Sequence, residues 1–129
     1  MPYIGLVITS IGFLIPSFFA WKNRKKFDAK LSSIVACTSV LYHGTLHPIA
    51  HRVDYFIAHS VGLISIGRIF RRVFILKRWN ERWIFLGTIS SIGVYWFKSR
   101  CNFDMGSCLW HMLFHVSSQA TWTAHVLTT

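Results

Sequence analysis

The chain lacks the changes in composition that usually separate domains. Its 129 residues contain no Gly/Ser-rich linker, no internal repeat and no low-complexity tract, so we expect a single domain over residues 1–129. Cysteine is scarce as well, and three residues leave at least one thiol unpaired. Cys101 and Cys108 bracket a short loop and form either a disulfide or two free thiols, whereas Cys37 is expected to be a small packing residue.

Acidic residues are also few. The chain has 4 Asp and Glu against 14 Lys and Arg, a net charge of +10. Such an excess first suggests a nucleic-acid partner, but its distribution argues against one. Most of the positive charge lies in two segments, residues 22–30 and 71–82, without interleaved motifs for groove reading or base stacking. We therefore expect no nucleic-acid partner.

Apolar side chains are abundant, at 53% of the residues and a mean hydropathy of +0.42. Both values are too high for an ordinary soluble protein, and charged residues divide the sequence into five apolar stretches. We predict an all-α integral membrane bundle of about five transmembrane helices, at residues 4–21, 31–46, 53–70, 83–97 and 108–127. Several stretches are shorter than the ~20 residues that span a bilayer comfortably, so we expect local thinning or snorkelling of flanking Lys and Arg.

The positions of Lys and Arg predict how the helices cross the membrane. Short loops rich in these residues stay in the cytosol, which places the N-terminus outside or in the lumen and the C-terminus in the cytosol. The basic cluster follows the first apolar stretch instead of preceding it. That order is opposite to a secretory signal and predicts a retained first helix. The organelle stays open between the endoplasmic reticulum or Golgi and the plasma membrane.

Five polar residues lie at or near the ends of these apolar stretches: Ser39, His43, Asp54, His111 and His115. Ionisable groups at membrane depth are costly and are usually kept for function. Ser39 and His43 are four residues apart, as are His111 and His115, so each pair projects from one helix face. The predicted topology brings all five groups to the same depth, near the non-cytosolic surface.

Three imidazoles near a carboxylate are what a catalytic zinc site needs, because zinc binds imidazole nitrogen and keeps one position open for water. We predict His43, His111 and His115 as the metal ligands. Bound water then has a pKa near ~7, and Asp54 would act on it as general base and later as acid. Ser39 would either hold this water or stabilise the oxyanion.

Each part of this constellation also has a simpler interpretation. A pair of histidines on an apolar helix often serves packing or interhelical hydrogen bonding. Asp54 is equally well explained as a helix cap, and Ser39 as a small residue that lets helices approach. Gln119 and Trp122 continue the face of the second histidine pair and are expected to line a cavity leading from the metal.

The remaining histidines are expected to lie outside the metal site. His47 and His51 suit either a solvated or interfacial position or a place at the mouth of the site, and His59 an interhelical hydrogen bond. His125 is more than two turns beyond His115, too deep toward the cytosol to share the metal. Arg68 is expected to snorkel.

The order and spacing of the five residues resemble a known set of motifs. Ser39-Val-Leu-Tyr-His43, then Asp54 eleven residues on, then His111-Met-Leu-Phe-His115-Val look like the Ser-x-x-x-His, Asp and His-x-x-x-His motifs of the CREST superfamily. This superfamily includes alkaline ceramidases, the progestin and adiponectin receptors with haemolysin III relatives, and a branch of lipid-remodelling proteins. The segment from His43 to Asp54 is most similar to the ceramidases, and His-x-x-Phe-His-Val to the receptor branch.

The resemblance implies a zinc-dependent hydrolase of a ceramide-like lipid amide or an ester, in which the three histidines bind zinc and Ser39 and Asp54 support the attacking water. The superfamily has a core of seven helices, so this chain resembles a shortened version. With fewer helices around the metal, one chain would enclose the substrate cavity only in part, and a homo-oligomer is one way to complete it. The alternative is a non-enzymatic membrane protein, receptor-like or pore-forming, whose histidines only brace helices.

Overall fold

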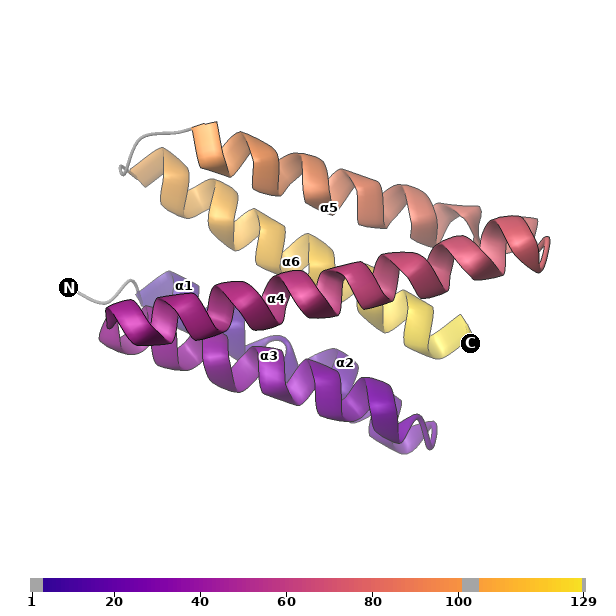
Figure 1. The fold of residues 1–129 in the computed structure, drawn as a ribbon, viewed down its shortest axis with the longest axis horizontal. Helices are drawn as coiled ribbons and strands as arrows, with labels where there is room; N and C mark the ends of the chain where they lie inside the picture. The colour runs from indigo at the N-terminus through magenta and orange to yellow at the C-terminus, as the bar shows by residue number, and fades with distance from the viewer. Residues whose placement is uncertain (1–3, 101–104, 129) are drawn as a thin grey trace.

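The computed structural model describes residues 4–100 and 105–128, and the side chains of residues 4–97 and 109–128. These residues form five helical rods, and the described part of the chain contains no β-strand. Successive rods run in opposite directions, so the first begins at one end of the bundle and the last finishes at the other (Figure 1). The all-α prediction is confirmed.

The first rod is broken near its middle into α1 (Ile4–Ile11) and α2 (Leu14–Lys22). Pro16 explains the break, because it has no N–H to donate to the carbonyl of Gly12 and its ring crowds that carbonyl. The chain closes a tighter turn instead, in which the N–H of Ile15 donates to the carbonyl of Gly12 at 2.9 Å. The stretch predicted at residues 4–21 is therefore one rod, helical except for a break at residues 12 and 13.

The next two rods, α3 (Lys26–Thr45) and α4 (Pro48–Phe70), each begin five residues before the starts predicted at 31 and 53. The start of α4 has a local cause. Pro48 occupies the first helical position, where a missing N–H costs nothing, and the side chain of His47 accepts a hydrogen bond from the N–H of Ile49 at 3.2 Å. The proline and its cap set the boundary, whereas the apolar pattern alone placed it too late.

The link between the third and fourth rods is short and held by an ion pair. α4 continues into one π-helical turn, η1 (Arg71–Ile75), and a 3-10 turn, η2 (Trp79–Glu81), leads into α5 (Arg82–Arg100). The buried carboxylate of Glu81 accepts two hydrogen bonds from Arg72, at 2.7 and 2.6 Å. This contact lowers the pKa of Glu81 below its usual value of 4.5, and it fixes the two turns to each other.

The last rod is α6 (Met105–Thr128). The helices predicted at residues 83–97 and 108–127 lie within α5 and α6. The choice between a disulfide and free thiols at Cys101 and Cys108 lies outside the residues whose side chains are described. Cys37 is a free thiol and is exposed, so its predicted role in packing is wrong.

A second ion pair ties α3 to α4. Arg68 donates to both carboxylate oxygens of Asp28, at 2.5 and 3.1 Å, and Asp28 is buried. Arg68 therefore reaches an opposite charge at the start of the neighbouring helix while its own side chain is 40% exposed, and its snorkelling toward the membrane surface stays a prediction. The contact holds α4 to the bundle near the end where the basic segments lie.

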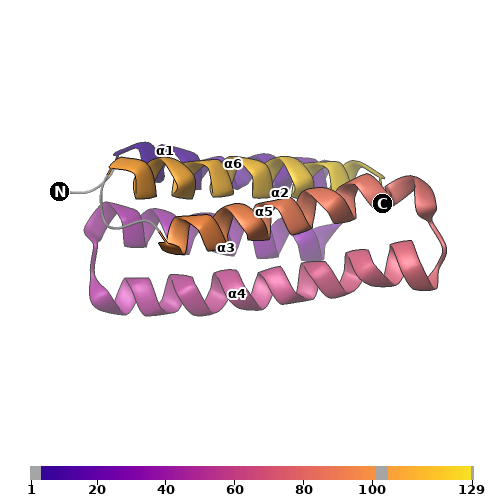
Figure 2. The same cartoon turned by 90° about the horizontal axis from the view of Figure 1, so that it is seen from above.

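Two segments are long and apolar enough to cross a membrane: Ile4–Lys22 and the continuous helix Pro48–Ile75. The second runs along one edge of the bundle (Figure 2). Its outward side chains include Phe56 and Leu63, which are 72% and 71% exposed. That these two segments and the other rods cross a membrane stays a prediction.

Candidate metal centre

The rings of His43, His111 and His115 meet in the structure. His43 lies in the last turn of α3, and the other two lie in the first turns of α6. The ring centroids are 4.8 Å apart for His43 and His111, 5.5 Å for His43 and His115, and 4.7 Å for His111 and His115. Among the described residues, these are the His, Cys, Asp or Glu side chains that gather in a group able to hold a metal ion.

The donor set fits zinc. Each ring offers one nitrogen, and these nitrogens all lie within 4.8 Å of one another. Two imidazole nitrogens bound to one tetrahedral zinc ion at ~2.0–2.1 Å lie about 3.3 Å apart. Side-chain adjustments that close the largest separation by about 1.5 Å would therefore complete the set. His43 and His115 are only 2% and 3% exposed, and His111 is half-buried.

Ser39 lies one turn before His43 on α3 and is buried as well. Its hydroxyl is 3.0 Å from that of Ser10 on α1. The hydroxyl of Ser10 in turn donates to the carbonyl of Leu6 at 2.6 Å. With its single proton used there, Ser10 accepts from Ser39, and the lone pairs of Ser39 can accept a further hydrogen bond.

Asp54 lies in the second turn of α4 and does not cap that helix, because the cap is His47. The interpretation of Asp54 as a cap is therefore wrong. Its carboxylate accepts a hydrogen bond from the hydroxyl of Thr38 on α3 at 3.0 Å. It faces inward and is half-buried.

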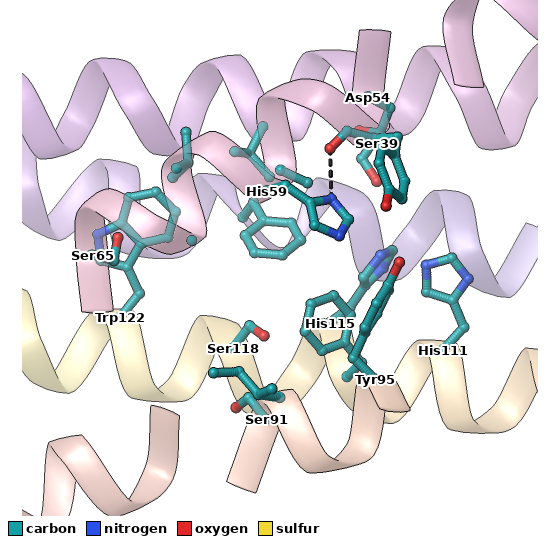
Figure 3. A pocket seen from close by; sticks show the side chains of 18 of the residues that line it. Ser39, Asp54, His59, Ser65, Ser91, Tyr95, His111, His115, Ser118 and Trp122 are labelled. Carbon is teal, nitrogen blue, oxygen red and sulfur yellow. Dashed lines mark hydrogen bonds between the residues drawn. The ribbon is translucent and has the colours of Figure 1, made fainter. Parts of the chain in front are cut away.

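All five predicted residues line one cavity of about 820 Å³. In Figure 3, His111, His115 and Tyr95 point toward the side of the cavity on which Ser39 and Asp54 lie. The cavity continues between α4 and α6 as far as His125. His125 is ten residues beyond His115 on one helix, which corresponds to a depth of about 15 Å.

The walls of this cavity beyond the histidines are largely apolar. They include Val61 and Ile69 from α4 and Trp122 from α6, with a few hydroxyls such as Ser65 and Ser118 between them. The prediction that Trp122 lines a cavity is confirmed. Gln119 was predicted to line it too, but its amide donates to the carbonyl of Thr9 at 2.5 Å and α1 covers it, so that prediction is wrong.

The other histidines lie apart from the cluster. His47 and His51 are exposed near the start of α4, where His51 lines the cavity, and His125 is buried at the far end of the cavity. His59 also lines the cavity, but its Nδ1 donates to the carbonyl of Tyr55 on its own helix at 2.7 Å. The hydrogen bond predicted for His59 therefore forms within one helix and not between two.

The sequence interpretation missed the contribution of α1. Thr9 Oγ1 lies 3.0 Å from Nδ1 of His115, and Ser10 contacts Ser39. The signal that could have found them is their position. Two adjacent hydroxyl residues interrupt an otherwise apolar stretch between Ile8 and Ile11, and polar side chains in such helices usually bond to a neighbouring helix.

Comparisons with protein-family models, with curated proteins and with solved structures find no match to this chain.

Proposed function

We propose that this chain is a zinc-dependent intramembrane hydrolase that cleaves a ceramide-like lipid amide, or a lipid ester, with water. One observation supports the proposal above all: His43, His111 and His115 lie together at one end of an apolar cavity that Asp54 also lines. The resemblance of the motifs to the CREST superfamily supports the same assignment of residues.

The three histidines would hold the metal through one ring nitrogen each. When bound, zinc supplies Lewis acidity, which makes water more acidic, with a pKa near ~7, and polarises a carbonyl. Asp54 takes a proton from the attacking water and later delivers it to the leaving amine or alcohol. Thr38 donates to one oxygen of Asp54 and so holds the carboxylate in one orientation. Ser39 accepts a hydrogen bond from the water, because its own proton is directed to Ser10.

The cavity binds the chain of the lipid. Its volume of about 820 Å³ lies in the usual range of ligand pockets, roughly 300–1,000 Å³. Its apolar walls along α4 and α6 would cover an acyl chain whose carbonyl lies at the histidines. The products would be a fatty acid and an amine or alcohol, which leave through the bilayer or through its surface.

A membrane location follows from the same arrangement. The rods carry many exposed large apolar side chains, which lipid would cover. The basic segments 22–30 and 71–82 connect rods at one end of the bundle (Figure 1). With these segments in the cytosol, all five rods cross the membrane, the N-terminus is outside or lumenal, and the histidines lie near the outer surface.

The first prediction separates metal binding from catalysis. Asp54→Asn should retain zinc and lower kcat by about 10²–10⁴-fold, the usual contribution of a general base. Ser39→Ala should also retain zinc and lose about tenfold, the equivalent of one hydrogen bond. The assay follows release of a fluorescent fatty acid from a ceramide and from a fatty-acid ester in mixed micelles.

Ser117→Ala is the matched control, because among the described residues the hydroxyl of Ser117 donates to the carbonyl of Phe114 of its own helix, at 3.1 Å, and to no other group. It should leave turnover unchanged. Full activity in both Asp54→Asn and Ser39→Ala would show that their assigned roles are wrong. A zinc-loaded wild-type protein that cleaves neither lipid would remove the hydrolase proposal.

A non-enzymatic membrane protein with structural histidines is the second candidate. It is favoured by the edge-to-face packing of the three rings and by the contact of His115 with Thr9, because both can brace helices without a metal. In that case His43→Phe would keep the thermal stability of the protein, and metal analysis would find no zinc.

A further inference from the structure

One face of α1 packs unusually closely on α6 beside the metal centre. Gly5 and Thr9 of α1 lie on this face, and Gly12, directly after α1, continues it. A Cβ atom on Gly5 would lie 2.6 Å from Sδ of Met112, and one on Gly12 would lie 2.3 Å from Oε1 of Gln119. The two glycines therefore let the backbone of α1 approach α6 on either side of Thr9.

The close contact at Gly12 tolerates a larger residue less well than the one at Gly5, because Gln119 is held in place and Met112 is not. Met112 meets Gly5 with the flexible end of its side chain, which can move aside. The amide of Gln119 is held by its hydrogen bond to the carbonyl of Thr9 at 2.5 Å. This bond fixes the backbone at Thr9 against α6, one helical turn from His115.

The hydroxyl of Thr9 can donate one proton, and its neighbours decide where that proton goes. Oγ1 lies 3.0 Å from the carbonyl of Gly5 and 3.2 Å from that of Leu6, and a carbonyl only accepts. The third neighbour is Nδ1 of His115 at 3.0 Å. A hydroxyl that gives its proton to a carbonyl accepts a hydrogen bond from Nδ1, and in this arrangement Nδ1 of His115 carries the ring proton.

A protonated Nδ1 places the lone pair of the neutral ring on Nε2. A metal-binding histidine generally donates its other ring N–H to a fixed acceptor, which sets the tautomer and orients the ring. We propose that Thr9 is the positioning residue of the metal centre: it holds His115 in the Nδ1–H form, so that Nε2 is the nitrogen offered to zinc. This inference rests on the proposed function, and Gln119 supports it by fixing α1.

The test compares Thr9→Val, which keeps the shape and removes the acceptor, with Thr9→Ser, which restores a hydroxyl. Zinc affinity is measured by competition with a chromophoric chelator in detergent micelles. Thr9→Val should bind zinc about 10- to 100-fold more weakly, and Thr9→Ser should recover most of the affinity. Thr128→Val is the matched control, because the hydroxyl of Thr128 bonds to the carbonyls of Ala124 and His125 of its own helix, and its affinity should equal that of the wild type.

A second readout does not need the metal. The ¹⁵N chemical shifts of labelled histidines in metal-free protein report which ring nitrogen carries the proton. Wild-type protein should show the Nδ1–H form for His115, identified by the loss of its signals in His115→Gln, and Thr9→Val should shift this equilibrium. Wild-type affinity together with an unchanged tautomer in Thr9→Val would overturn the inference. A wild-type protein that binds no zinc would overturn the proposed function. The ¹⁵N shifts of metal-free protein would still show whether Thr9 sets the tautomer of His115.

Gln119→Met provides an independent variant if Thr9→Val does not fold. It removes the amide donated to the carbonyl of Thr9 and leaves both Thr9 and His115 in place. We expect a smaller loss of zinc affinity, about threefold to tenfold. Wild-type affinity in this variant would show that the docking of α1 does not position the centre.

Discussion

Two buried histidines on α6 differ in what surrounds them. His115 contacts two other imidazoles and Thr9. His125 is buried to the same extent, but its Nε2 is shielded from solvent and has no hydrogen-bond partner among the described residues. A buried polar atom without a partner costs about 1–3 kcal/mol, so His125 destabilises the fold locally whereas His115 is integrated into a site.

The second prediction follows from this difference. His125→Phe removes an unpartnered polar atom and keeps an aromatic ring of similar shape, so the melting temperature should stay the same or rise. Zinc content should stay at the wild-type level, because the cluster lies about 15 Å away along the helix. Loss of zinc in His125→Phe would place this residue in the metal centre after all, contrary to the assignment.

At the scale of helices, the link between α4 and α5 depends on one buried carboxylate. Glu81 accepts from Arg72 at 2.7 and 2.6 Å and from Arg78 at 3.4 Å. Its side chain is 7% exposed, compared with 51% for Arg78. The pair with Arg72 is therefore the contact that matters for stability, because exposed pairs contribute little.

The third prediction concerns this ion pair. Glu81→Gln should lower the stability at pH 7 by about 2 kcal/mol, because it leaves Arg72 without a carboxylate. The hydrogen bonds from Arg72 lower the pKa of Glu81 below 4.5, so the contribution is present above pH 4.5 and is lost as the pH falls further. Melting curves in micelles from pH 7 downward should show the wild type and Glu81→Gln converging below pH 4.5.

Arg78→Gln is the control for this experiment and should change stability by less than about 1 kcal/mol. A difference between wild type and Glu81→Gln that stays constant as the pH falls would mean that the charge of Glu81 is not what stabilises the link.

The helices also show what a sequence pattern can and cannot predict. Apolar stretches between charged residues were enough to predict the rods, and the four-residue spacing of His111 and His115 was enough to place them on one face. The break near Pro16 and the helix start at Pro48 were missed because the boundaries were placed by the apolar pattern alone. A proline interrupts a helix in its interior and favours the first helical position. The contact of Thr9 with His115 depends on how α1 is rotated against α6, which no pattern within one helix contains.

At the scale of the whole molecule, alternating rods bring the last turn of α3 and the first turns of α4 and α6 to one end of the bundle. This arrangement is why residues far apart in the sequence line a single cavity. The topology predicted from the sequence already brought these residues to the same end of the bundle. The dimensions of the cavity could not be predicted, because they depend on the long-range packing of α4 against α5 and α6.

The fourth prediction tests the topology. In a background with Cys37, Cys101 and Cys108 replaced by serine, a membrane-impermeant maleimide should label Thr45→Cys from outside and Lys77→Cys only after the membrane is opened. Both positions are exposed in the structure, so accessibility to the reagent is decided by the membrane. Labelling of both from the same side would contradict a bundle that crosses the membrane with the basic segments in the cytosol.

The most direct test of the account is the zinc content of the purified protein, measured by mass spectrometry of the metal together with protein quantification. The wild type should carry one zinc ion per chain. His43→Ala and His111→Ala should lose it, and His125→Phe, a substitution of a buried histidine outside the cluster, should keep it. A wild-type protein without zinc, purified under conditions that preserve zinc in a known zinc enzyme, would contradict the central claim that these three histidines form a metal centre.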